Sequence, residues 1–251
     1  MKPFALRSAL QVLLPAALLL ASCSKKDEPA PTPAPDQARI VFVHAAPSAN
    51  IAVKFLVDDS EKGQVAYGAN TGYQSVLAGT ARSVKVNVAS SGTNALTQTI
   101  AVGKDLSYSF FAYTPAAGIG VAGVLISDDL TVPASGSARV RVVHLAPGAP
   151  AMVRLSQSTI AGAVDLPGAS ATFGGTSQFI TIPAGPYNLL VTSGSPSTTL
   201  LNVGNGTGTG LATETKTYES GKIYTVAVWG NSLPTNLDPA LQPRAVVIAH
   251  N

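Results

Sequence analysis

The sequence repeats itself once, and this repeat constrains the fold more than any other feature. Residues 38–47, ARIVFVHAAP, return at 138–147 as ARVRVVHLAP, displaced by 100. Three further pairs keep the same order with larger displacements: Tyr67-Gly68 with Phe173-Gly174 by 106, Gly103-Lys104 with Gly221-Lys222 by 118, and 123–126 with 245–248 by 122. Because loops accept insertions at a small entropic cost, the pattern predicts a tandem duplication with longer loops in the second copy. We place the copies at residues 38–132 and 138–251.

Each copy carries short apolar runs separated by turn residues. In residues 83–88, SVKVNV, apolar and polar residues alternate with the period of two that is typical of a half-buried strand. No stretch after residue 37 has the spacing of an amphipathic helix. Comparable runs predict strands at 40–44, 52–57, 73–77, 107–113 and 121–126. About seven short strands in a copy of roughly 100 residues favour a sandwich over a barrel. The predicted fold class is all-β, with two tandem immunoglobulin-like antiparallel β-sandwich domains.

The N-terminus has the pattern of an export signal. Lys2 and Arg7 precede an apolar run that is shorter than the about 20 residues a membrane-spanning helix needs. The run ends in Leu-Ala-Ser-Cys at residues 20–23, and Cys23 is the only cysteine of the chain. This arrangement resembles bacterial lipoproteins, which implies a signal peptide at 1–22 and a diacylglycerol on Cys23. Two or three acyl chains would anchor the protein stably to a membrane. The alternative is an ordinary cleaved signal with an incidental cysteine.

Residues 23–37 predict an extended tether. Four prolines alternate with small or polar residues between 29 and 35, a composition that cannot bury apolar surface. Ser24 after the cysteine resembles lipoproteins that are passed to the outer membrane of Gram-negative bacteria. The charged run at 26–28, Lys-Asp-Glu, resembles signals for export to the cell surface, although a solvated charge cluster explains it equally well.

The motifs of both copies together resemble one known family. The segments are VRVVHLAP at 140–147, VAYG at 65–68 leading to LAG at 77–79, and GKIYTV at 221–226. In combination they resemble the bacterial domain of unknown function DUF4397. The resemblance covers essentially all of residues 38–251, and it implies an exported β-sandwich that is often duplicated, is often carried by a lipoprotein and has no established reaction.

The charge distribution excludes nucleic acid as an expected partner. The net charge is +3, but Lys2 and Arg7 lie in the predicted signal peptide. From residue 38 onward, 12 basic residues face 10 acidic ones, and no segment concentrates the basic ones as a phosphate-binding stripe requires.

The histidines and carboxylates predict no catalytic or metal site. His44 and His144 are equivalent in the repeat, and alternation places them on the inward face, so we expect each to bond a backbone group of the following Ala-Pro turn. His250 is expected to be exposed or frayed. No second histidine or cysteine stands at zinc-ligand spacing, and Asp128-Asp129 lacks the spaced carboxylates of a calcium loop, so solvated carboxylates and no cofactor are expected.

Two aromatic residues are the candidate ligand contacts. Tyr113 and Trp229 end equivalent strands and lead into loops, where exposed rings would stack on sugars or anchor a partner. Packing in the core is the competing explanation. The sequence thus predicts a non-enzymatic lipoprotein of the outer membrane, facing the cell surface or the periplasm, that acts in adhesion, in glycan or protein binding, or as a structural module. The alternative is a periplasm-facing enzyme with a site between the two domains.

Overall fold

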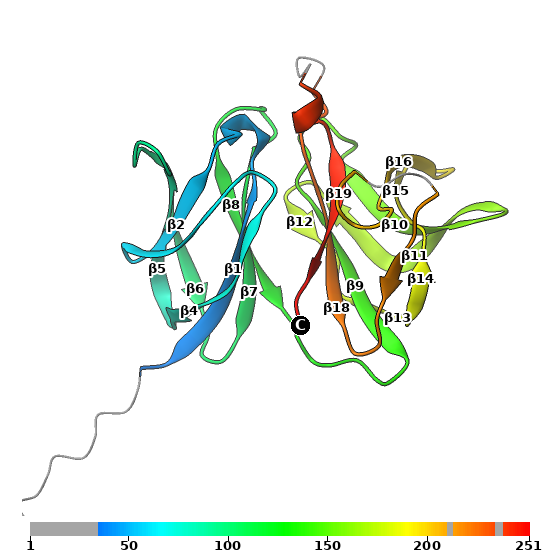
Figure 1. Ribbon diagram of the computed structural model, residues 1–251, viewed down its shortest axis with the longest axis horizontal. Coiled ribbons are helices and arrows are strands. Elements are labelled where there is room, and N and C mark those ends of the chain that lie inside the picture. The colour runs from blue at the N-terminus through cyan, green and yellow to red at the C-terminus, as the bar shows by residue number, and fades with distance from the viewer. Residues whose placement is uncertain (1–34, 210–212, 234–237) are drawn as a thin grey trace, which may run out of the picture. The chain divides into compact units, whose positions relative to one another are not determined.

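The computed structural model describes residues 35–209, 213–233 and 238–251, and Pro35–Asn251 forms one compact unit (Figure 1). The predicted signal peptide, Cys23 and the tether up to residue 34 lie outside the described residues. Among the residues that are described, no helix is long and apolar enough to cross a membrane. The helical turns there are two 3-10 turns, η1 (Pro47–Ala49) and η2 (Pro239–Leu241).

The first half folds into two four-stranded sheets. Their strand orders are β4-β1-β7-β8 and β3-β2-β5-β6. The strands are β1 (Gln37–Ala45), β2 (Val53–Val57), β3 (Ser60–Val65), β4 (Asn70–Leu77), β5 (Gly79–Val88), β6 (Asn94–Val102), β7 (Ser107–Tyr113) and β8 (Ala122–Asp128). The strands β1 and β7 are parallel, and every other neighbouring pair in these two sheets is antiparallel.

The second half repeats this strand order. One sheet has the order β12-β9-β18-β19, with β13 also paired to β9, and the other has the order β11-β10-β15-β16. The pairing of β9 with β18 is again parallel. The strands are β9 (Ser137–His144), β10 (Met152–Thr159), β11 (Gly162–Thr172), β12 (Gly175–Thr176), β13 (Ile180–Pro183), β14 (Gly185–Tyr187), β15 (Leu189–Ser193), β16 (Thr198–Asn202), β17 (Lys216–Tyr218), β18 (Ile223–Trp229) and β19 (Arg244–Ala249). The short strands β14 and β17 form a separate hairpin.

The predicted all-β fold agrees with these sheets, whereas the immunoglobulin-like arrangement is not confirmed. An immunoglobulin constant domain places its strands A, B, E and D in one sheet and C, F and G in the other. Here β4, β1, β7 and β8 share one sheet in the first half, and β12, β9, β18 and β19 take the corresponding places in the second. The pairs β1–β7 and β9–β18 are parallel. The period of two predicts that a segment is a strand but carries no information on which strand becomes its neighbour.

Three apolar clusters hold the described chain together. The first half encloses one between its two sheets, with Phe42, Phe55 and Phe110 at its centre. The second half encloses another, to which β9, β10, β15 and β18 contribute. The third lies between the two halves, where the sheet that contains β1 contacts the sheet that contains β9. We call this third cluster and the polar groups beside it the seam.

Candidate functional site

The apolar part of the seam buries the outward faces of β1, β7, β9 and β18. Its members are Val41, Val43, Ala45, Phe111, Ile126, Val143, Leu145, Ala227, Trp229 and Ile248. Strand β9 is therefore covered on both faces, by its own sandwich and by the first half. Removal of this much apolar surface from water fixes the two halves to each other.

For Trp229 the structure agrees with packing, the alternative to an exposed ring. Its side chain belongs to the seam and is only 1% exposed, so the ring offers no face to a sugar. Tyr113, at the equivalent position, is partly buried and packs edge-to-face on Phe173, with ring centroids 5.9 Å apart. Both strand ends are covered to different extents because the other half packs against them.

Beside the apolar cluster, five side chains form a closed ring of hydrogen bonds, which we call the seam ring. Arg141 Nε donates to Thr225 Oγ1 at 2.8 Å, and that hydroxyl lies 2.7 Å from His250 Nε2. His250 Nδ1 lies 2.8 Å from the hydroxyl of Tyr73, which donates to Asp128 Oδ2 at 2.6 Å. An ion pair between Arg141 Nη2 and Asp128 Oδ1 closes the ring.

One arrangement of protons satisfies every member of the seam ring. Thr225 donates to His250 Nε2, His250 Nδ1–H donates to the Tyr73 oxygen, and Tyr73 donates to Asp128. This arrangement requires a neutral imidazole, because a second ring proton would leave the Thr225 hydroxyl without its acceptor. Burial lowers the pKa of His250 to about 4, with Asp128 opposing the shift and Arg141 adding to it. The expectation of an exposed or frayed His250 is wrong, since the residue is 8% exposed and bonded on both ring nitrogens.

The ion pair of the ring is buried in a way that the sequence does not reveal. The side chains of Arg141 and Asp128 are 2% and 0% exposed, whereas the sequence predicts a solvated Asp128 at a strand end. Two further bonds satisfy them: Ser109 Oγ donates to Asp128 Oδ2 at 2.8 Å, and Arg141 Nη1 donates to the Ser127 carbonyl at 3.0 Å. A buried pair is tolerated when hydrogen bonds satisfy both charges, and the loss of one partner is then costly.

The ring joins positions that are equivalent in the two halves but carry different residues. Strand register aligns Val41 with Arg141, Tyr73 with Phe179, Ser109 with Thr225, and Asp128 with His250. The two halves therefore meet through the same face, as the subunits of a twofold dimer do. At this face the first half provides the carboxylate and the phenol, and the second provides the guanidinium and the imidazole.

The repeated histidines His44 and His144 are buried outside the seam ring. His44 Nε2 lies 2.9 Å from the Ala49 carbonyl, and His144 Nε2 lies 2.9 Å from the Pro150 carbonyl. Each ring also packs edge-to-face on an equivalent aromatic residue, Tyr67 for His44 and Phe173 for His144. Burial lowers the pKa of both histidines, so they are neutral near pH 7 and fasten the loop that follows their strand.

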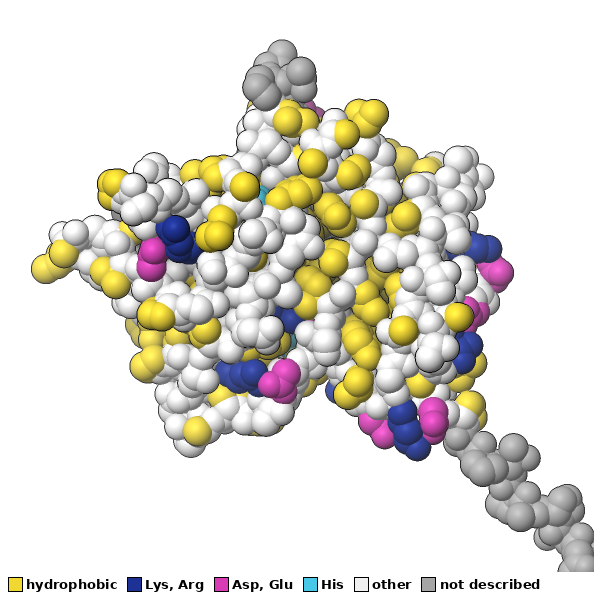
Figure 2. Space-filling view, turned by 180° about the vertical axis from the view of Figure 1, so that it is seen from behind, with side chains coloured by type: hydrophobic (Ala, Val, Ile, Leu, Met, Phe, Trp, Pro, Cys, Tyr) yellow, Lys and Arg dark blue, Asp and Glu magenta, His cyan; other side chains and the backbone are white. Residues whose placement is uncertain are grey.

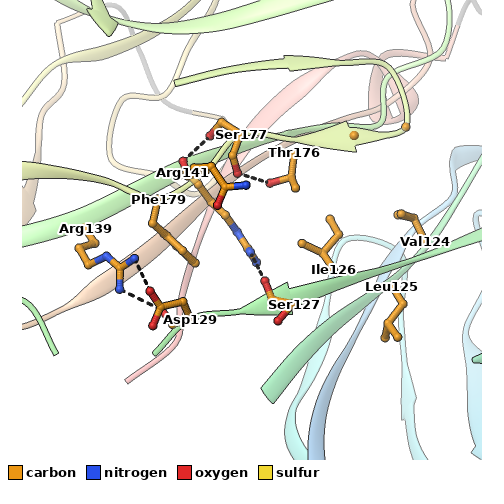
Figure 3. Close-up of a pocket in the computed structure, with 13 residues that line it drawn as sticks. Val124, Leu125, Ile126, Ser127, Asp129, Arg139, Arg141, Thr176, Ser177 and Phe179 are labelled. Carbon is orange, nitrogen blue, oxygen red and sulfur yellow. Dashed lines mark hydrogen bonds and ion pairs between the residues drawn. The ribbon is translucent and has the colours of Figure 1, made fainter. Parts of the chain in front are cut away.

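A groove of about 420 Å³ runs along one side of the seam (Figure 3). One wall is the strand β8, from Val124 to Ser127, and the other is the segment 174–179, which includes β12. Figure 3 shows Arg139 and Arg141 at one end of the groove, on either side of Phe179. Neither His44 nor His144 lines this groove.

The charged groups at that end of the groove are already engaged. Arg139 Nη2 donates to Asp129 Oδ2 at 2.7 Å, and its Nη1 donates to the Asp129 and Thr131 carbonyls. The hydrogen bond from Arg139 lowers the pKa of Asp129, so this carboxylate is ionised. The guanidinium carbons of Arg139 and Arg141 lie 5.1 and 4.3 Å from the centre of the Phe179 ring. The polar end of the groove is thus a preformed wall with little unused hydrogen-bonding capacity.

Elsewhere in the first half, eight charged side chains form four separate ion pairs. The pairs are Lys54–Glu61, Arg82–Asp58, Lys85–Asp59 and Lys104–Asp36. Figure 2 shows basic side chains next to acidic ones near the rim of the face it presents, and hydrophobic side chains along its middle. This face carries no continuous positive stripe. Within the described part of the chain, no group of three or more His, Cys, Asp or Glu residues could hold a metal ion.

The groups that could take part in chemistry and the solvent-open groove lie side by side at the seam. The groups able to move protons, Tyr73, Asp128 and His250, are bonded to one another. Asp128 and His250 are buried, and Tyr73 is partly buried. The groove that is open to solvent is lined by apolar side chains of β8 and Phe179, by a larger number of polar or charged side chains, and by backbone at Gly174 and Gly175. The sequence does not reveal the seam ring because its members are drawn from segments far apart in the chain.

Comparison with known proteins identifies little that is similar to this chain. No curated protein matches it. A crystal structure of a leucine-rich repeat protein from Bacteroides thetaiotaomicron matches 80% of this chain at 15% identity with a TM-score of 0.18. The chain spans only 26% of the length of that structure. Residues 38–154, the first half and the first strands of the second, match the family described as Domain of unknown function (DUF4397).

Proposed function

We propose that the chain is a non-enzymatic lipoprotein of the cell envelope, whose two halves act together as one rigid binding module. The observation that carries this proposal is the seam. The polar groups that could otherwise take part in chemistry join the two halves, and the solvent-open groove beside them is preformed. A preformed concave surface lowers the entropic cost of binding.

The proposal also treats the second half as a second copy of the same domain. The support is the repeated strand order, the equivalent parallel pairs β1–β7 and β9–β18, and the equivalent histidine contacts. Duplication with an inward-facing, shared interface gives one body with two similar outer surfaces, which suits adhesion or binding to an extended ligand.

Anchoring follows from the sequence pattern at Cys23, which the proposal takes as the lipidated residue on the outer membrane. The tether at 23–37 would hold the rigid module away from the bilayer. The test is protease shaving of intact cells that express the wild type or a variant with residues 25–28 replaced by alanine. Digestion of the wild type and protection of the variant would support display through the charged run. Protection of both would place the module in the periplasm.

Ligand binding itself needs a separate test. Tyr113 is the one aromatic candidate that keeps part of its surface open, so Tyr113→Ala should reduce retention on a panel of immobilised glycans if sugars are the ligand. The matched control is Tyr108→Ala, which removes a similar ring from the opposite face of the same strand. An enzymatic function would instead be supported if the chain hydrolysed a substrate and lost that activity in His44→Gln or His144→Gln.

A further inference from the structure

Strand β8 has an edge that no other strand covers. Within the described ranges β8 pairs only with β7, which leaves the groups on its other side unpaired with any strand. The groove follows that side, because four consecutive residues, Val124 to Ser127, line it. Side chains of a strand alternate between faces, so a surface that touches four residues in succession runs along the backbone edge.

The equivalent edge in the second half is covered by the chain itself. Val247 N donates to the Gly206 carbonyl at 2.8 Å, and Thr207 forms an isolated antiparallel bridge with Val246. The segment 205–207 thus lies along β19 as a short added strand. Close approach requires glycine at 206, because a Cβ there would lie 2.8 Å from Val247 Cγ2.

Alignment of the two halves shows which backbone amides of β8 point away from β7. The displacement of 122 pairs Val247 with Leu125 and Val246 with Val124, and β8 pairs with β7 in the same register as β19 with β18. The amide of Leu125 therefore points away from β7, into the groove, as the amide of Val247 points toward Gly206. The amide of Ser127, two residues further along, points the same way.

We propose that β8 binds an extended segment of another protein, which adds antiparallel to the strand along residues 124–127. This inference rests on the proposed binding function and names its ligand class. Backbone amides and carbonyls at strand spacing match a polypeptide and match no regular feature of a glycan. The groove also continues the interface between the halves, since Ile126 belongs to the seam and Val124 packs against it.

The occupant should be uncharged and rich in small residues where it passes the second wall. That wall includes Gly174 and Gly175, which carry no side chains, so it presents backbone at this point. The charged groups at the end of the groove are paired with each other and leave no unmatched charge for an ionic ligand. Affinity would come from backbone hydrogen bonds and from contact with Val124 and Ile126.

The test is residue-resolved amide hydrogen exchange on the full chain with a probe peptide. The probe has the sequence of residues 202–209, NVGNGTGT, because this segment already covers the equivalent edge. Without the probe, the Leu125 amide should exchange much faster than the Val247 amide. A millimolar concentration of the probe should slow exchange at Leu125 and Ser127 at least several-fold and leave Val247 unchanged.

Two matched controls separate strand addition from other binding. A probe that is N-methylated at alternate residues keeps its side chains but loses backbone donors, and it should give no protection. Ser127→Pro removes the outward amide without touching the β7 pairing, whereas Ser127→Ala keeps it; the Ser127 side chain is exposed, so neither change disturbs the core. Protection of Leu125 should be lost in the proline variant and kept in the alanine variant.

Three outcomes would overturn the proposal. These are no protection of β8 at millimolar probe, protection of another edge instead, or protection that depends on the concentration of the chain alone, which would make a second copy the occupant. None of them decides the broader binding function, which the glycan panel and the cell-shaving experiment test independently.

Discussion

The two halves share a strand order but treat their equivalent surfaces differently. At the seam, the first half presents Asp128 and Tyr73 where the second presents His250 and Phe179. Two identical faces would have placed like groups opposite each other across the contact. The two faces are instead complementary, because a carboxylate and a phenol on one meet a guanidinium and an imidazole on the other.

The outer edges of β8 and β19 also differ between the two halves. In the second half, the loop that carries Gly206 closes the edge of β19, whereas the first half leaves the edge of β8 open. Exposed strand edges are hazards that proteins commonly cover or shorten. One covered edge and one open edge in otherwise similar halves point to a use for the open one.

The largest effect is expected when one partner of the buried ion pair is removed. Asp128→Ala leaves the Arg141 charge buried without its partner and should lower the free energy of unfolding by about 3–5 kcal/mol. The control is Asp129→Ala, next in the sequence, which breaks a pair whose carboxylate is 58% exposed and should cost less than about 1 kcal/mol. Urea unfolding measures both. Equal losses would show that the seam ring contributes nothing special to stability.

A comparable loss is expected at the apolar part of the seam. Trp229→Ala should cost about 3–5 kcal/mol because it empties a buried site between the halves. Tyr113→Ala, at the equivalent but partly open position, should cost clearly less. Equal losses in the free energy of unfolding would contradict the deeper burial of Trp229. Thermal and urea unfolding of the pair would decide.

Lowering the pH should lower the free energy of unfolding, because the buried histidines are neutral in the folded chain. The pKa of His250 is about 4 in the folded chain and near 6.5 when unfolded, so the unfolded state binds a proton first as the pH falls. Stability from this group is complete above pH 6.5 or so and falls by roughly 3 kcal/mol toward pH 4. His44 and His144, whose pKa values are also lowered by burial, add in the same direction.

The measurement is urea unfolding at several pH values between 7 and 4 for the wild type and His250→Gln. The variant is less stable at pH 7, but its stability should decline less steeply with acid. Parallel declines in the two proteins would contradict the assignment of a neutral His250 to the seam ring.

A smaller effect is expected where the second half covers its own edge. Gly206 has φ of +85°, so Gly206→Ala carries both a backbone cost of about 1 kcal/mol and a clash with Val247. Gly72→Ala has a similar φ of +66° with open space around the added carbon, so it isolates the backbone cost. The first substitution should be the more destabilising and should speed exchange of the Val247 amide. Equal effects, with Val247 still protected, would mean that the loop tolerates displacement.

In the first half, the sequence predicts six of the eight strands and misses two that lack a strong alternating pattern. The predicted runs at 40–44, 73–77, 83–88 and 107–113 all lie within observed strands. Strand β3, SEKGQV, was not predicted because it is largely polar, and its place at the edge of a sheet demands little apolar surface. Strand β6 was likewise missed because it also lies at an edge and exposes most of its residues.

The seam ring could not be predicted from the sequence, for a different reason. Alternation correctly places Arg141 on the face of β9 opposite to Val140 and Val142. A single strand cannot show that this outward face is covered by another domain, because the covering residues, Tyr73 and Asp128, lie elsewhere in the chain. Asp128 therefore has the local sequence of a solvated strand end and the surroundings of a core residue.

The seam ring also sets an order of events during synthesis. Asp128 and Tyr73 emerge from the ribosome long before His250, which follows Asp128 by 122 residues. Most of the apolar contact and the Arg141–Asp128 ion pair need only strands up to β18. Until the segment after β18 has been made, the seam lacks Ile248 and His250, and the seam ring stays open between the Tyr73 and Thr225 hydroxyls. The ring is therefore completed only when the C-terminal residues of the chain have been synthesised.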